Sequence, residues 1–228
     1  MTATHKAKQV LRKQIRSSLS SLSTQELSQQ SSQVWETVFD LPQYKASQSV
    51  GLFLSMPKGE IQTDEACCRV LADGKTLYVP RVGLDFEQCD MDLIRVPLND
   101  YEMAKKTNDV FYDDWPRNKW NIPEAPSDDA KYQIAQPGDI DLLIVPGLGF
   151  DKQGGRLGQG KGYYDRFILK MREDQSHQNH ANDTVLKPLL VAVGLNPSFV
   201  QDGIPMMDHD FRMDMLVLPD DLIDVEKN

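Results

Sequence analysis

Short, mainly apolar runs recur along this chain, and segments with helical character separate several of them. The runs lie at 49–55 (SVGLFLS), 76–82 (TLYVPRV), 91–96 (MDLIRV), 141–146 (DLLIVP), 188–194 and 215–218. Strands that are apolar along their whole length are buried on both faces, as in parallel sheets covered by helices. The pattern therefore predicts an α/β protein: one domain over residues 1–228, with a mostly parallel, Rossmann-like open sheet and helices on both faces.

Local signals place the helices and the irregular chain. Ser23-Thr-Gln-Glu26 fits a capping box, which starts a helix that we expect to end near Leu41-Pro42. We expect further helices at 63–72 and 163–172. The stretch 97–138 is polar and contains several prolines, so we expect irregular chain wrapped over the core there. Residues 173–184 are polar without periodicity and predict a surface insertion, in which His177 and His180 are interpreted as solvated rather than as metal ligands.

Charge is distributed unevenly between the two parts of the chain. The formal net charge is −9, but residues 1–25 hold five basic and no acidic side chains, which leaves −14 on the remainder. Such an acidic body argues against nucleic-acid binding, where clustered Lys and Arg supply most of the affinity. The apolar positions Leu11, Ile15 and Leu19 have helical spacing, which favours a basic amphipathic first helix over the alternative, a mitochondrial presequence.

The cysteines and the hydropathy suggest the compartment. Three cysteines (Cys67, Cys68 and Cys89) are an odd number without metal-ligand spacing, and we interpret them as core residues in a reducing environment. The longest apolar run is far shorter than the ~20 residues of a membrane-spanning helix. We therefore expect a cytoplasmic protein that does not bind membranes, with mitochondrial import left open, and we expect a monomer.

A glycine-rich segment follows the apolar run 141–146. Seven of the fourteen glycines lie between Gly147 and Gly162, interleaved with Arg156 and Lys161, and a predicted helix follows at once. Glycines let a ligand approach backbone N–H groups, and a helix N-terminus favours anions, so the pattern predicts a phosphate site. A standard P-loop is excluded because Gly162 stands where the Mg²⁺-binding Ser or Thr should be. The alternative is a flexible surface loop.

These residues, with others far along the chain, resemble the 5-formyltetrahydrofolate cyclo-ligase family, also called methenyltetrahydrofolate synthetases. The resemblance is carried by PGLGFD at 146–151, RLGQGKGYYDR at 156–166, LFLSMPKGEI at 52–61, WNIPE at 120–124, Lys8 to Arg12, and the acidic pattern of Asp208, Asp210 and Asp214. The matching segments span most of the chain in the family's order.

The resemblance implies an enzyme, an ATP- and Mg²⁺-dependent ligase that converts 5-formyltetrahydrofolate to 5,10-methenyltetrahydrofolate and releases ADP and phosphate. It implies phosphorylation of the formyl oxygen, then ring closure by N10, with Arg156 and Lys161 as catalytic cations. The implied ATP contacts are Lys8, Arg12, Arg156, Leu157, Gly158, Gln159, Gly160, Lys161, Gly162, Tyr163 and Tyr164. The implied folate contacts are Leu54, Glu60, Gln159, Gly160, Lys161, Gly162 and Tyr163.

The same resemblance places Mg²⁺ on Asp165 and Asp210. Mg²⁺ in ATP enzymes takes one or two carboxylates together with phosphate oxygens and water. From the residues alone, the alternative for Asp165 is an acid favoured by the helix dipole, and the alternative for Asp210 is a loop or capping acid. Leu54 alone would be interpreted as a core strand residue, and Glu60 as a solvated turn residue. The alternative function is a non-catalytic nucleotide- or folate-binding protein on the same fold.

Overall fold

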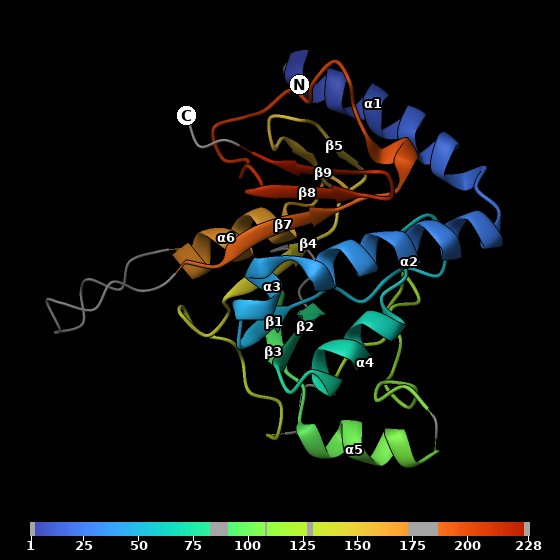
Figure 1. Ribbon diagram of the computed structural model, residues 1–228. Helices are drawn as coiled ribbons and strands as arrows, with labels where there is room; N and C mark the ends of the chain where they lie inside the picture. The colour runs from blue at the N-terminus through green and yellow to red at the C-terminus, as the bar shows by residue number, and fades with distance from the viewer. Residues whose placement is uncertain (1–2, 83–90, 108, 127–129, 173–186, 226–228) are drawn as a thin grey trace, which may run out of the picture.

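A seven-stranded mixed sheet forms the centre of the computed structural model, which describes residues 3–82, 91–107, 109–126, 130–172 and 187–225 (Figure 1). Its strand order is β3-β2-β1-β4-β7-β8-β9. The strands are β1 (Ser49–Gly51), β2 (Thr76–Val82), β3 (Met91–Arg95), β4 (Leu142–Val145), β7 (Leu189–Val193), β8 (Met215–Leu218) and β9 (Asp221–Asp224). The central strands run parallel, and β3 and β9 pair antiparallel at the two edges. This is the predicted open, mostly parallel sheet.

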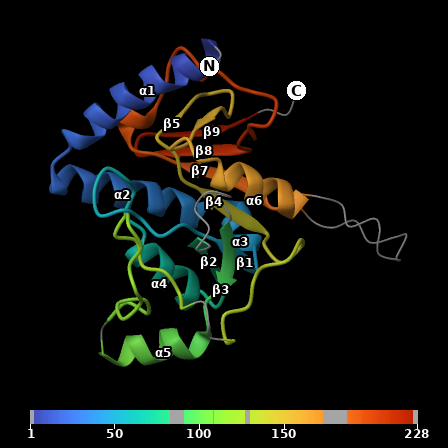
Figure 2. The ribbon, with the colours of Figure 1, turned by 180° about the vertical axis from the view of Figure 1, so that it is seen from behind.

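Helices cover both faces of the sheet. They are α1 (Ala3–Ser20), α2 (Thr24–Asp40), α3 (Pro42–Ala46), α4 (Asp64–Ala72), α5 (Leu98–Thr107), α6 (Tyr163–Arg172) and a 3₁₀ turn, η1 (Asn196–Ser198). Helices α2, α3 and α4 lie on one face in Figure 1, and α6 lies on the opposite face in Figure 2. Alternate residues of β4 serve the two layers: Leu142 and Ile144 pack with α2 and α4, whereas Leu143 and Val145 pack with α6.

The two N-terminal helices form as their sequences predict. Ser23 Oγ accepts a hydrogen bond from the Glu26 amide at 3.2 Å, and Glu26 Oε2 accepts one from the Ser23 amide at 2.8 Å. This reciprocal pair is the predicted capping box. In α1, Ile15 and Leu19 are buried in the core, which confirms the amphipathic helix.

Three local expectations need correction. The stretch 97–138 is not irregular throughout, because α5 occupies ten of its residues; that part has no proline and contains good helix formers, although only Tyr101 is buried. The strand expected over residues 49–55 ends at Gly51, and the chain continues as buried irregular backbone. Part of the glycine-rich loop is a small hairpin, in which β5 (Gly149–Phe150) pairs with β6 (Arg156–Leu157).

Some sequence features fall on parts of the chain that the structure does not describe. Cys89, His177, His180 and the whole of the predicted insertion 173–184 lie outside the described residues. Cys67 is buried and Cys68 half-buried, both as free thiols in α4. In the described ranges, no helix combines the length and the hydropathy that crossing a membrane would require.

Candidate active site

A cavity of about 840 Å³ opens at the carboxyl ends of the parallel strands. Its walls include Phe53 and Leu54 after β1, Val82 at the end of β2, and Pro146 and Gly147 after β4. Ligands of open α/β sheets bind outside the carboxyl ends of their strands. The parallel arrangement therefore brings segments that are far apart in sequence to one site.

The glycine-rich loop forms one wall of this cavity. After β6 the chain passes through Gly158, Gly160 and Gly162 and enters α6 directly, as the sequence predicts. Gly160 and Gly162 have φ values of +101° and +72°, a backbone region that side chains with a Cβ rarely occupy. The wall thus consists of peptide backbone and a helix N-terminus, which suits an anion.

Arg156 is held in this wall, and only 6% of its surface is exposed. Its Nη2 donates to Asp165 Oδ2 at 2.8 Å, and its Nη1 donates to the Pro146 carbonyl at 3.3 Å. The guanidinium lies 5.8 Å from the ring centroid of Tyr164. Its Nε is buried and has no hydrogen-bond partner within the described part of the chain. A buried N–H without a partner costs free energy, so this atom points to a missing acceptor.

Helix α1 lies along the cavity and contributes three cations spaced four residues apart: Lys8, Arg12 and Arg16. That spacing places their side chains on one face of the helix. Arg12 Nε donates to the Gly158 carbonyl at 2.9 Å, and Arg16 Nη2 donates to Gln159 Oε1 at 2.7 Å. Burial, together with neighbouring Arg16, lowers the pKa of Arg12. Helix α1 is therefore joined to the loop by polar contacts from its basic face.

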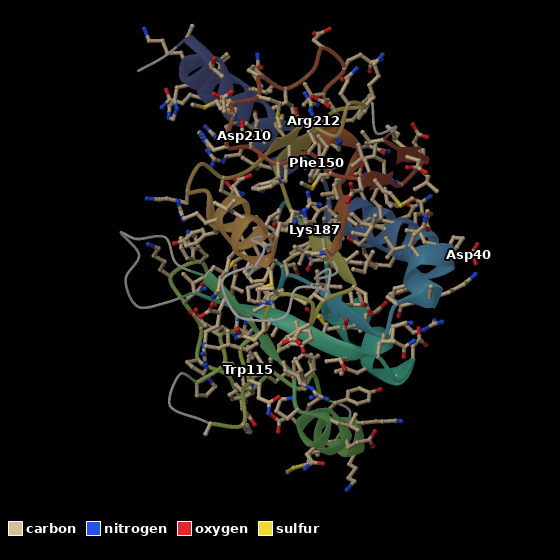
Figure 3. The ribbon with its side chains drawn as sticks, turned by 90° about the vertical axis from the view of Figure 1, so that its left-hand side faces the viewer. Asp40, Trp115, Phe150, Lys187, Asp210 and Arg212 are labelled. Carbon is tan, nitrogen blue, oxygen red and sulfur yellow. The ribbon has the colours of Figure 1, made fainter. Side chains whose placement is uncertain are left out.

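The two predicted metal ligands lie on the same cavity wall. Asp165, in the first turn of α6, accepts a hydrogen bond from the Phe211 amide at 3.4 Å, and Phe211 directly follows Asp210. Asp210 forms an ion pair with Lys8 and accepts the Met207 amide at 2.7 Å. Figure 3 shows Asp210 beside α1. The described ranges contain no group of three or more His, Cys, Asp or Glu side chains placed to hold a metal ion.

Glu60 and Leu54 come to the cavity from the segment after β1. Leu54 is buried, with its remaining surface on the cavity. Glu60 Oε2 accepts the Met56 amide at 2.8 Å, which closes the turn. Burial raises the pKa of Glu60 to about 7, although that hydrogen bond opposes the shift. Burial and the nearby Glu60 charge also raise the pKa of Tyr164 above its ordinary value, against the influence of Arg156.

Among the lining residues that were not predicted as site residues, two groups make polar or ring contacts within the cavity wall. Trp120 and Glu124 bring the proline-interrupted stretch to the cavity, and the Trp120 ring meets the Tyr163 ring edge-on at 6.3 Å. Glu124 accepts a hydrogen bond from the Val82 amide, which ties this stretch to β2. Arg16 is the other addition. Its spacing from Lys8 and Arg12 was the available signal for Arg16, and an isolated tryptophan in a polar stretch was the signal for Trp120.

The structure brings nearly all the predicted residues together. Those lining the cavity are Lys8, Arg12, Leu54, Glu60, Arg156, Gly158, Gln159, Gly160, Lys161, Gly162, Tyr163, Tyr164, Asp165 and Asp210. Leu157 differs, because its side chain is fully buried in the core and its carbonyl accepts the Leu148 amide at 2.8 Å. Residue Leu157 therefore supports the loop from beneath and offers no side-chain contact to a ligand.

Fold and cavity together define an α/β protein with a candidate small-molecule site at the carboxyl ends of its strands. Comparison with known proteins identifies its family: the profile of the 5-formyltetrahydrofolate cyclo-ligase family matches residues 4–219. The chain belongs to this family, and it is an enzyme.

Individual relatives agree over nearly their whole lengths. The 5-formyltetrahydrofolate cyclo-ligase of Mus musculus is 30% identical over 94% of both chains. A probable 5-formyltetrahydrofolate cyclo-ligase of Schizosaccharomyces pombe is 30% identical over 95% of this chain and 97% of its own. The solved structure of Aquifex aeolicus 5,10-methenyltetrahydrofolate synthetase superposes with a TM-score of 0.70 at 26% identity, covering 97% of this chain and 94% of that one.

Proposed function

We propose that this enzyme converts 5-formyltetrahydrofolate to 5,10-methenyltetrahydrofolate, consuming ATP in the presence of Mg²⁺ and releasing ADP and phosphate. The single observation that carries the proposal is Arg156, a buried cation whose Nε lacks an acceptor among the described residues. It shares one cavity with a half-buried carboxyl group, Glu60, on another segment. A phosphate and an N–H-rich ring are ligands of opposite character, and this cavity offers a group for each.

The size of the cavity supports two substrates. At about 840 Å³ it lies toward the upper end of the range for ligand pockets, ~300–1,000 Å³. Its basic loop and helix face suit a triphosphate. The wall with Glu60 and Leu54 suits a flat, partly polar ring. Two substrates held in one cavity react as if at very high concentration, which supplies a large part of the acceleration.

The chemistry follows from the weakness of the substrate as an electrophile. A formamide carbon reacts poorly with amines, and its oxygen is a poor leaving group. Transfer of the γ-phosphoryl group to the formyl oxygen breaks the bond to the β-phosphate oxygen and yields ADP. N10 then attacks the activated carbon and loses its proton, and the C–O bond breaks to release phosphate. The formyl oxygen therefore leaves within that phosphate.

The loop cations suit this transfer. Phosphoryl transfer depends on positioning and on neutralising the charge that develops on the oxygens, with little covalent chemistry from the protein. Arg156 is fixed by Asp165 and the Pro146 carbonyl, so its guanidinium is already oriented. Lys161 is exposed on the cavity side of the loop and brings a second positive charge. Lys8 and Arg12 add charge from α1.

The residues present fit a magnesium ion. Asp165 and Asp210 are oxygen donors that line the same cavity, and the amide of Phe211, the residue after Asp210, donates to Asp165. They would hold Mg²⁺, which supplies charge neutralisation for phosphate oxygens when bound. In the described structure each carboxylate is paired with a cation, Arg156 or Lys8. These ion pairs hold the two carboxylates in place.

Glu60 would orient the folate. In its ionised form a carboxylate accepts hydrogen bonds only, so it complements the N–H groups of a reduced pterin.

A chain that presents every group from one polypeptide needs no second copy, and we propose that it acts as a monomer. A cytoplasmic location also fits, because removal of a presequence that included Lys8 and Arg12 would remove part of the cavity wall.

The decisive test follows the formyl oxygen. Purified enzyme is supplied with Mg-ATP and substrate labelled with ¹⁸O in the formyl group, and the released phosphate is examined by mass spectrometry. We expect one labelled oxygen in each phosphate. Unlabelled phosphate with normal product formation would refute phosphorylation of the formyl oxygen. An absence of turnover, with tight binding of both ligands, would favour a non-catalytic binding protein.

A further inference from the structure

Asp151 lies at the base of the glycine-rich loop, outside the cavity, and is only 2% exposed. Its Oδ1 accepts hydrogen bonds from the Gln153 and Gly155 amides at 2.9 and 2.8 Å. Its Oδ2 accepts the Ile204 amide at 2.7 Å, across 53 residues of sequence. A single buried carboxylate thus binds two segments that approach the cavity from different parts of the chain.

Backbone contacts join the same two segments on either side of Asp151. The Val200 amide donates to the Phe150 carbonyl, and the Met213 amide donates to the Gly154 carbonyl, both at 2.8 Å. Arg212 Nη1 also donates to the Gln153 carbonyl at 2.7 Å. Figure 3 shows Phe150, Arg212 and Asp210 gathered at one end of the molecule. The Asp151 side chain lies at the centre of these hydrogen bonds between the two segments.

The two segments pack so closely around Asp151 that they restrict which residues can stand at positions 154 and 155. A Cβ at Gly155 would lie 2.3 Å from Asp151 Oδ2. A Cβ at Gly154 would lie 2.5 Å from the Met213 carbonyl oxygen, and the φ of Gly154 is +78°. Side-chain atoms essentially never approach so closely, so both positions need glycine while the two segments stay joined. These two glycines are explained by the carboxylate contact and its surroundings rather than by a ligand.

We propose that Asp151 is a positioning residue for the reaction. The hydrogen bond to Gly155 fixes the residue that precedes Arg156, and the hydrogen bond to Ile204 fixes the segment that leads to Asp210. The proposal rests on the proposed function, in which these two residues serve phosphate and metal. Asp151 holds them in register with each other without touching a substrate. Supporting contacts of this kind typically change affinity or activity by ~10- to 100-fold.

The test compares Asp151→Asn with a matched control, Asp141→Asn. Asp141 also accepts backbone amides, those of Gln48 at 2.7 Å and Ser49 at 3.0 Å, but at the opposite end of the sheet. In Asp151→Asn the new NH₂ group faces a backbone N–H, so at least one hydrogen bond is lost. We expect kcat to fall at least ~10-fold and half-saturating Mg²⁺ to rise, with the folate KM within about twofold of wild type.

In the control both amides donate to one oxygen, Oδ2, which the Asn carbonyl can replace, so Asp141→Asn should lose less thermal stability and keep its kcat and its Mg²⁺ dependence. Gly155→Ala displaces the carboxylate from the other side, and should reproduce the phenotype of Asp151→Asn. Hydrogen exchange, measured by mass spectrometry without ligands, should speed up over residues 153–155 and around Ile204 together in Asp151→Asn and in Gly155→Ala, but not in Asp141→Asn.

Each outcome decides between the claims. If the wild type turns over and Asp151→Asn matches the control in kcat, Mg²⁺ dependence and exchange, the positioning role is refuted. If the wild type does not turn over, the proposed function fails, and the exchange comparison still decides whether Asp151 joins the two segments. Exchange that rises at one segment alone would overturn the joint positioning.

Discussion

Glu60→Gln should change how stability depends on pH, because this half-buried carboxyl group lines the cavity and has a raised pKa. Burial raises its pKa from an ordinary 4.5 to about 7. The folded state therefore keeps its proton over a pH range in which the unfolded state has lost it. With more protons bound when folded, the free energy of unfolding falls as pH rises from about 4.5 to about 7, then levels off.

The size of the effect follows from the shift. Each pKa unit corresponds to about 1.4 kcal/mol, so the rise from 4.5 to about 7 sets an upper bound of about 3.5 kcal/mol. Glu60 retains some exposure to the cavity, and water there screens the charge, so we expect ~1–2 kcal/mol. Glutamine keeps the shape and cannot ionise. Relative to wild type, the stability of Glu60→Gln should therefore increase progressively from pH 5 to pH 8, and the total gain over this range should be that amount.

Urea unfolding followed by circular dichroism at half-unit pH intervals measures this difference directly. Folate affinity should respond with the opposite sign, because the ionised carboxylate is the form that accepts N–H groups. Wild-type affinity should therefore rise from pH 6 to pH 8, whereas that of Glu60→Gln should be weak and nearly flat. A stability difference that is constant across this pH range would refute the raised pKa.

Three further sets of variants test the rest of the site. Arg156→Ala and Lys161→Ala should each lower kcat/KM by ~100-fold or more in the steady-state assay; only Arg156→Ala should also lower Tm, because it leaves Asp165 without its cation. Deleting residues 1–16 should abolish turnover or raise the ATP KM steeply, and full activity of the truncated enzyme would contradict this expectation. Lys8→Ala alone should destabilise the fold, because the nearly buried Asp210 loses its ion pair with Lys8. Asp165→Asn and Asp210→Asn should need far more Mg²⁺ for half-maximal rate, and an unchanged Mg²⁺ titration would remove that residue from the site.

Much of the fold could be predicted because burial and local capping leave clear signals. The run Leu142–Val145 is apolar at every position because helices cover both faces of its strand. Helix α6 was predicted over residues 163–172, as observed, since glycines precede it and its apolar face is regular. Strand β9 gave no such signal. Its sequence, Asp-Leu-Ile-Asp, is mostly exposed at the sheet edge, where acidic side chains also discourage pairing with other chains.

The site was only partly predictable, because its key pairings join distant residues. The glycine loop and its cations form a local pattern, so Arg156 and Lys161 could be found in the sequence. The partner of Lys8 is Asp210, 202 residues away, and no spacing rule connects them. Asp151 belonged to a recognisable motif, but its role depends on Ile204, whose amide it binds. Such contacts are set by topology, which periodicity does not specify.

The most direct test of the central claim follows formation of the methenyl product by its absorbance. Purified enzyme is mixed with 5-formyltetrahydrofolate in reactions that contain ATP and Mg²⁺, lack one of them, or lack both. We predict an absorbance increase only when both are present, with one ADP and one phosphate released per product. An increase that is independent of ATP, or none in the complete mixture, would contradict the proposed reaction.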